Sequence, residues 1–267
     1  MVVTADHQKH FVLVHGVGHG AWSWFKIKQL LEEAGHRVTA VDLAASGTNT
    51  NTRLEDLHTV HDYSKPLLKI MSSIIPADEK VVLVGHSYGG INMALAMDEY
   101  PEKVSVAVYV SALMPDAIHA PSYVLDEYLK WIPEGHMIDT QFLPYAGISE
   151  DQETSVLFGH KYISTKLYHK CSNEDIALAK MLVRPMSLFT ENLSEIKPFP
   201  REGYGSVKRV YITCNEDKAV PLEFQQWLIE NIGVAEVIEM KNADHNPMFS
   251  QPHELCRYLL EIAERYI

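Results

Sequence analysis

The feature that most constrains this chain is a serine between two glycines at the end of a β-branched apolar run. The run 81–84 leads into Gly85-His86-Ser87-Tyr88-Gly89, and helix-favouring residues follow over 90–97. This order predicts a buried strand, a sharp turn and a helix. Glycines two positions from Ser87 on either side leave room for a strained turn. The serine would stand at the start of a helix, where backbone N–H groups favour developing negative charge.

Ser87 is therefore a candidate nucleophile, and a nucleophilic serine needs a histidine base that an acid orients. The run 208–214 predicts a strand, and Asp217 follows its end. The run 235–240 predicts a further strand, and His245 comes after it. In an open parallel sheet, the loops at the carboxyl ends of strands carry function. The order serine, acid, histidine thus predicts a triad of Ser87, Asp217 and His245.

Three other carboxylates compete with Asp217 for the acid position. Glu216 directly precedes it, and Asp116 follows the predicted strand 104–112. Asp244 adjoins His245, so its side chain is badly placed to fold back onto the ring. Asp217 is favoured from the residues alone, while Glu216 and Asp116 remain open.

A glycine-rich loop predicts the place where a developing oxyanion would bind. The apolar strand 11–14 runs into His15-Gly16-Val17-Gly18-His19-Gly20. With the turn after the nucleophile, this loop predicts an oxyanion hole made by the N–H groups of Val17 and Tyr88. The loop lacks the Gly-Lys-Ser/Thr ending of a phosphate-binding loop, which argues against nucleotide binding. The simplest roles for His15 and His19 are hydrogen bonds that shape the loop.

The rest of the chain alternates strand-like and helix-like stretches, which predicts a parallel sheet with right-handed crossovers. Further strands are expected at 9–15, 36–43 and 80–85, with helices at 21–34, 60–73 and 88–98. The rhythm breaks between 114 and 200, where helix-like pieces occur at 123–131 and 174–182. We expect one α/β core from residues 1–113 and 201–267. Residues 114–200 would be a cap inserted in that core, lining an apolar substrate pocket.

Charge and cysteine content exclude several classes of function. A net charge of −12 and a pI of about 5.6 argue against nucleic acid and against anionic membrane surfaces as partners. The three cysteines are widely spaced, so they predict neither a disulfide framework nor a metal site. The first ten residues form no signal peptide, and no apolar run approaches the roughly 20 residues of a membrane span. We therefore expect a cytoplasmic protein with a short loose amino-terminal tail.

With these residues assembled, the chain resembles the plant methylesterase and hydroxynitrile lyase branch of the α/β-hydrolase superfamily. The resemblance runs nearly end to end and is carried by the turn at Ser87 and by residues 10–16, 34–47, 203–211, 216–218 and 243–245. It implies an α/β-hydrolase fold with a mostly parallel sheet of about eight strands and a mainly helical cap. It also implies no cofactor and no metal, a possible homodimer, and Asp217 rather than Glu216 as the acid.

The resemblance implies a serine carboxylesterase that hydrolyses the methyl ester of a small plant metabolite through an acyl-enzyme. Gly16, His86 and Asn246 are expected at the substrate pocket. Lyases of this branch resemble the chain less, because they carry a side chain near Gly16 and a lysine after the catalytic histidine, where Asn246 stands here. The esterases usually have an apolar residue at that point, so Asn246-Pro247 is also unusual for them. A lyase and a hormone-binding receptor role remain the alternative hypotheses.

Overall fold

Six strands of the chain pair side by side into one parallel sheet. The computed structural model describes residues 8–144 and 154–266, so the expected loose tail at residues 1–7 lies outside the described part. The strand order is β2-β1-β3-β4-β8-β9, and all five pairings are parallel. The bounds are β1 His10–Val14, β2 Arg37–Val41, β3 Val81–His86, β4 Val104–Val110, β8 Arg209–Cys214 and β9 Glu236–Met240.

The residues alone indicated these six strands, and each one is confirmed to within two residues at most bounds. The count of about eight strands that the resemblance implied is wrong for the described residues. Outside the segment 114–200, the described residues form six strands, of which the edge strands β2 and β9 are only partly buried.

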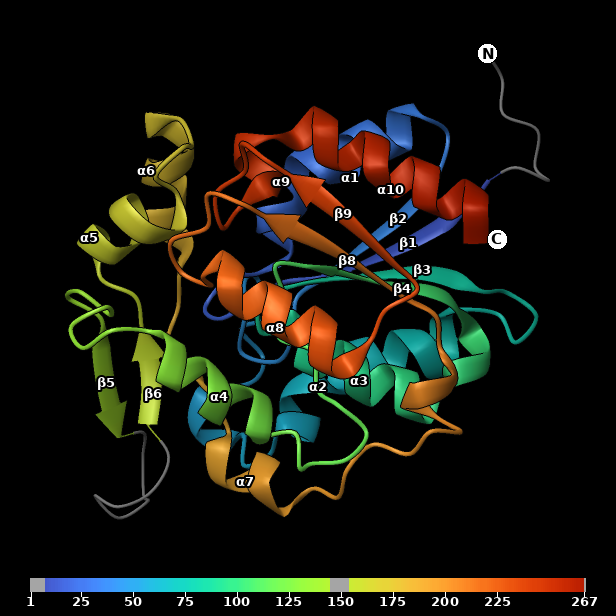
Figure 1. Cartoon of the computed structure of the whole chain (residues 1–267), viewed down its shortest axis with the longest axis horizontal. Helices are drawn as coiled ribbons and strands as arrows, with labels where there is room; N and C mark the ends of the chain where they lie inside the picture. Colours follow the sequence, from blue (N-terminus) through green and yellow to red (C-terminus); the bar gives the residue numbers. More distant parts are fainter. Residues whose placement is uncertain (1–7, 145–153, 267) are drawn as a thin grey trace.

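Helices cover both faces of the sheet because side chains of each strand alternate between the faces. Phe11 and Leu13 of β1 pack on one side, and Val12 and Val14 pack on the other. The first side is covered by α1 (Phe25–Glu33), α9 (Pro247–Ser250) and α10 (Pro252–Tyr266); the second by α2 (Val60–Lys69), α3 (Gly89–Glu99) and α8 (Leu222–Ile232) (Figure 1). None of the described helices is both long and apolar enough to cross a membrane.

Local signals account for where these helices begin and end. The Thr59 side chain accepts a hydrogen bond from the Asp62 N–H, and the Asp62 carboxylate bonds back to Thr59, which caps α2. The expected helix 21–34 begins with a 3-10 turn, Ala21–Trp24, and ends at Gly35 with φ of 92°. Further single turns of 3-10 or π type cover Leu54–Asp56, Ile70–Ile74, Pro101–Lys103, Ile163–Leu167 and Tyr204–Ser206.

The segment 114–200, here called the inserted segment, lies beyond the carboxyl ends of the parallel strands (Figure 1). Its helices are α4 Tyr123–Trp131, α5 His160–Tyr162, α6 Asn173–Leu182 and α7 Thr190–Glu195. The sequence indicated α4 and α6. It did not indicate the three-stranded antiparallel sheet of β5 (Gln141–Pro144), β6 (Thr154–Leu157) and β7 (Met186–Ser187). These strands are too short, and Phe142 and Leu143 too exposed, to give a buried-strand pattern.

Candidate active site

Ser87 stands on a strained turn between β3 and α3. Its φ of 55° lies in the left-handed region, which a serine adopts only when its surroundings impose it. Gly89 makes the turn possible, because a Cβ there would lie 2.7 Å from the His15 carbonyl oxygen and 2.8 Å from that of Val14. The helix start therefore packs directly on the backbone of β1, and Ser87 projects at the carboxyl edge of the sheet.

Asp217 is held by four hydrogen bonds just past the end of β8. Its Oδ1 accepts from the N–H groups of Ala219 at 2.7 Å and Val220 at 2.8 Å. Its Oδ2 accepts from the Ser111 hydroxyl at 2.5 Å and from the His245 ring at 2.7 Å. A buried carboxylate with four hydrogen bonds is fixed in position.

His245 follows β9 and its ring is almost wholly buried. Because the Asp217 carboxylate can only accept, His245 Nδ1–H donates to it, and Nε2 is left as the proton acceptor. His245 and Ser87 line the same cavity. Among the described residues no hydrogen bond joins the two side chains, and in unliganded sites such bonds often shorten only when substrate binds.

His86 packs against the His245 ring and binds its backbone. Its Nε2–H donates to the His245 carbonyl oxygen at 2.6 Å, and the two rings lie 4.6 Å apart. Burial, followed by the nearby His245 ring, holds the pKa of His86 well below its ordinary value. A neutral imidazole carries one N–H, and here the hydrogen bond to the His245 carbonyl uses it.

The rival carboxylates have other partners. Glu216 is about half exposed and forms an ion pair with Lys170 at 3.3 Å. Asp244 accepts hydrogen bonds from the Ser250 hydroxyl and the Lys170 N–H. Asp116 binds the ring and backbone of His119. Among the described contacts of the His245 ring, Asp217 is the only carboxylate partner.

Two buried histidines shape the loop after β1. His15 Nδ1–H donates to the Gly16 carbonyl at 2.9 Å, while its Nε2 accepts from the Leu43 N–H. His19 bonds to the Val17 carbonyl at 2.7 Å and to the Tyr168 hydroxyl at 2.7 Å. Burial lowers the pKa of His15 to about 4 and that of His19 to about 3, so both rings stay neutral at physiological pH.

The cavity above Ser87 has a volume of about 140 Å³ and is mostly apolar. Val17 and Tyr88, the residues of the expected oxyanion hole, are on its wall with Ser87 and His245. The inserted segment supplies much of the rest, including Leu125, Tyr128, Phe142, Val156 and Tyr162. Such a site can present a nucleophile, a base and backbone donors to a compact apolar substrate.

A family model described as "Alpha/beta hydrolase family" matches residues 11–258, which is most of the chain. The chain belongs to the alpha/beta hydrolase family. Within it, the hydrolase falls in the branch of the plant methylesterases, since it is 50% identical over 260 residues to methylesterase 1 of Arabidopsis thaliana.

Other relatives match this hydrolase over nearly its whole length. It is 57% identical to salicylic acid-binding protein 2 of Nicotiana tabacum, over 97% of the chain and 98% of that protein. It is 54% identical to norfluorocurarine synthase 2 of Strychnos nux-vomica, over 100% of the chain and 99% of that protein. The crystal structure of polyneuridine aldehyde esterase superposes with a TM-score of 0.93 at 54% identity, over 96% of the chain and 99% of that structure.

Ser111 is the residue at this site that the sequence reasoning missed. It follows β4, has φ of 41°, and donates to the carboxylate that orients His245. The available signal was a small polar residue at the carboxyl end of a strand that lies between the strands leading to Ser87 and Asp217.

The three residues expected at the pocket lie beside it rather than on its described wall. Gly16 packs against the nucleophile, because a Cβ there would lie 2.7 Å from Ser87 Cβ. His86 contacts His245 from the side away from the cavity. The buried Asn246 side chain donates to the Leu167 carbonyl at 2.9 Å. All three contact residues that line the cavity, and their expected role at the substrate pocket stays a prediction.

The described residues contain no group of three or more His, Cys, Asp or Glu side chains that would suit a metal ion. That a cofactor and a metal are not needed stays a prediction of the resemblance.

Proposed function

We propose that this hydrolase cleaves methyl esters of small, largely apolar carboxylic acids, with Ser87, His245 and Asp217 as its catalytic triad. One observation carries the proposal: a strained serine and a histidine line one apolar cavity, and a buried carboxylate with four hydrogen bonds fixes the ring. The names of esterases and methylesterases among its relatives support the same chemistry.

In the first half-reaction, His245 Nε2 takes the proton of the Ser87 hydroxyl as Oγ attacks the ester carbonyl. The oxyanion that forms is bound by the N–H groups of Val17 and Tyr88, whose loops are held by His15, His19 and α3. Protonated His245 is stabilised by Asp217 and then gives its proton to the departing methoxide. Methanol leaves, and the acyl group stays on Ser87.

In the second half-reaction, water replaces the alcohol. His245 removes a proton from the water, and the hydroxide adds to the acyl carbonyl. The tetrahedral intermediate then breaks its bond to Ser87 Oγ, which takes the proton back from His245, and the acid is released. A product with a carbonyl group β to its carboxyl then loses carbon dioxide to give a ketone or aldehyde, with no further group from the protein.

The cavity favours ester hydrolysis over the cleavage of cyanohydrins. A lyase must release cyanide, and a cation beside the histidine would stabilise it. The described lining contains no lysine or arginine, and the Asn246 amide is bonded to Leu167. A receptor that captures a small acid without turnover is the other alternative, and slow turnover with a tightly held product would favour it.

The experiment is methanol release from a panel of methyl esters: salicylate, jasmonate, indole-3-acetate and a β-formyl or β-keto ester. Ser87→Ala is the matched control, because it removes one oxygen atom and leaves the cavity. We expect release from at least one ester and none above background in the variant. No release from any ester, or equal release by Ser87→Ala, would overturn the proposal. Cyanide release from mandelonitrile identifies a lyase.

We also propose that residues 114–200 act as a cap over the core, that the protein is a cytoplasmic homodimer, and that it serves plant specialised metabolism. The contribution of the inserted segment to the cavity wall supports the first point. The family resemblance supports the others. Sedimentation equilibrium separates a 30.2 kDa monomer from a dimer of twice that mass, and a fluorescent fusion reports the compartment.

A further inference from the structure

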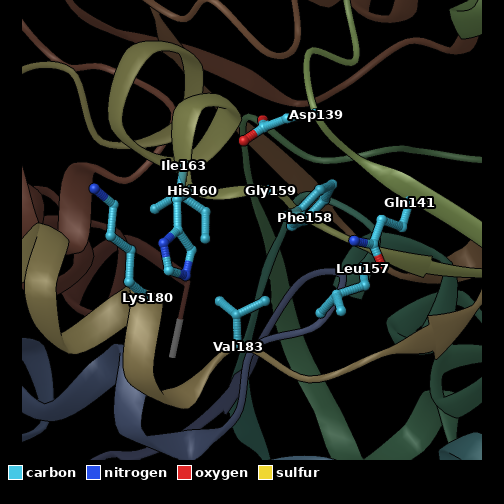
Figure 2. A pocket seen from close by; sticks show the side chains of 9 residues that line it. All are labelled: Asp139, Gln141, Leu157, Phe158, Gly159, His160, Ile163, Lys180 and Val183. Atoms are coloured by element: carbon cyan, nitrogen blue, oxygen red, sulfur yellow. The ribbon is translucent and has the colours of Figure 1, made fainter.

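A second pocket, of about 510 Å³, opens on the surface of the inserted segment (Figure 2). Lys180 and His160 lie on its helical side, and Gln141 and Leu157 lie on its strand side. Its volume falls in the range of about 300–1,000 Å³ that is usual for small-molecule sites. Ser87 and His245 do not line it.

The hairpin of β5 and β6 separates this pocket from the catalytic cavity. Side chains alternate between the two faces of a strand. Phe142 and Val156, which are paired across the hairpin, line the catalytic cavity. Gln141 and Leu157, the adjacent pair, line the second pocket.

Phe158, directly after β6, lines both spaces. Its ring stacks on Tyr162 with centroids 5.2 Å apart, and Tyr162 also lines the catalytic cavity. Phe158 is therefore a shared wall, so an occupant of the second pocket would contact a side chain that a substrate also contacts.

The amine of Lys180 is the group of the second pocket that can bind an anion. Among the described residues, no carboxylate lies within 4 Å of this partly buried amine. Asp139 is the pocket's one carboxylate among the described lining residues. Both its oxygens accept backbone N–H groups, from Lys161 and Tyr162 at 2.9 Å each.

The remaining lining divides into donors and an apolar part. The His160 ring can donate a hydrogen bond near Lys180, and the Gln141 amide can donate one from the opposite, strand side of the pocket (Figure 2). Leu157, Phe158, Ile163 and Val183 form the apolar wall. A carboxylate attached to a ring or a short branched chain satisfies both parts.

We propose that this pocket is a second binding site, for a small organic carboxylate with an apolar body, and that its occupancy changes turnover through Phe158. This is the chemical class of the acid that ester hydrolysis releases. The binding claim stands on the pocket alone, while the effect on turnover rests on the proposed function.

Equilibrium dialysis with radiolabelled benzoate tests the binding claim. The catalytic cavity is first blocked by reaction of Ser87 with diisopropyl fluorophosphate. We expect the blocked protein to bind one benzoate per chain. Lys180→Gln should weaken that binding by about fivefold to tenfold, because one charge-assisted contact at a partly exposed site is lost. Gln141→Glu, at an exposed position, should weaken it similarly by charge repulsion.

Lys161→Gln is the matched control, since it removes the same charge from an exposed position nearby that does not line the pocket. Its affinity for benzoate should equal that of the unaltered chain. Absence of benzoate binding to the blocked protein at millimolar concentrations would overturn the proposal. Benzoate affinities of Lys180→Gln and Gln141→Glu that match the affinity of the unaltered chain would do the same, and so would equally tight binding of benzylamine.

If the fluorophosphate does not label Ser87, the proposed function fails but the binding test remains. Unblocked wild-type protein should then still show one benzoate site per chain whose affinity falls about fivefold to tenfold in Lys180→Gln.

Steady-state kinetics test the effect on turnover. Benzoate should lower both the apparent affinity for an ester and kcat in the wild type, by occupying both sites. In Lys180→Gln the fall in kcat should need about fivefold to tenfold more benzoate, while competition with the ester stays the same. Purely competitive inhibition of the wild type would refute the effect on turnover.

Discussion

The core sheet and the inserted segment contribute different things to one cavity. The core brings Ser87, Asp217 and His245 to the carboxyl ends of three parallel strands of one sheet and holds Asp217 and His245 with buried hydrogen bonds. The inserted segment adds mainly apolar side chains from short helices and a small sheet. The proposed reacting groups thus come from the core, and most of the apolar wall comes from the inserted segment.

The two parts also differ in how firmly their residues are held. Asp217 has four hydrogen bonds and is buried. Phe142, which lines the same cavity, is 49% exposed on a strand of four residues. Changes in the core should therefore affect chemistry, through kcat, and changes in the inserted segment should affect substrate binding, through KM.

Asp217→Asn, a change in the core, should have the largest effect on kcat. The amide presents a donor to His245 Nδ1, so the ring adopts the tautomer that cannot accept the Ser87 proton. We expect kcat to fall about 10⁴-fold with a small change in KM. Glu216→Gln is the neighbouring control and should keep full activity. A large loss in Glu216→Gln with a mild one in Asp217→Asn would assign the acid to the other carboxylate.

The neutral histidines of the core make its stability depend on pH. Burial lowers the pKa of His15 to about 4 from its ordinary 6.5. The unfolded chain binds this proton below about pH 6.5 and the folded chain only below about pH 4, so acidification between these values favours unfolding. His15 should account for about 3 kcal/mol of that loss. Urea titrations across this range should show a weaker pH dependence in His15→Gln; an unchanged dependence would contradict this role of burial.

Ser111→Ala removes one of the two donors to Asp217 Oδ2. We expect kcat to fall about tenfold with KM nearly unchanged, because a hydrogen bond to a buried charged group is worth about 1.5 kcal/mol or more. Ser105→Ala, on the same strand, loses a hydrogen bond to the Val81 carbonyl and should keep kcat. Equal losses in both variants would mean that strand β4 is merely destabilised.

Phe142→Ala should have the smallest effect and should appear in KM. Loss of part of an apolar wall is expected to raise KM by about fivefold while kcat stays within about twofold. Leu143 is equally exposed but is absent from the described lining of the cavity, so Leu143→Ala should change neither constant. If kcat of Phe142→Ala fell as much as that of Ser111→Ala, the claim that the inserted segment affects KM and the core affects kcat would be wrong.

The sequence predicted the core far better than the inserted segment. Runs of buried β-branched residues and glycine turns carry their signal locally, so the six strands and the turn at Ser87 could be placed. Gly89 is required by contact with the backbone of β1, and the spacing of the motif already implied such crowding. The hairpin of β5 and β6 gave no comparable signal, because its pairing joins residues on either side of a loop.

Contacts between residues far apart in the sequence could not be predicted either. Ser111 reaches Asp217 over 106 positions of the chain, and His86 reaches His245 over 159. No local pattern marks either pair. Asn246 was expected at the pocket because it follows His245. Its amide donates a hydrogen bond to the Leu167 carbonyl. Only the packing of the inserted segment brings that carbonyl near, so nothing in the sequence indicated the contact.

Covalent labelling of Ser87 tests the central claim most directly. The protein is treated with diisopropyl fluorophosphate, and its peptides are analysed by mass spectrometry. We expect one label per chain, on Ser87. Ester hydrolysis should be lost in proportion to labelling, and Asp217→Asn should be labelled more slowly. A label on another residue, or hydrolysis that persists after Ser87 is fully labelled, would contradict it.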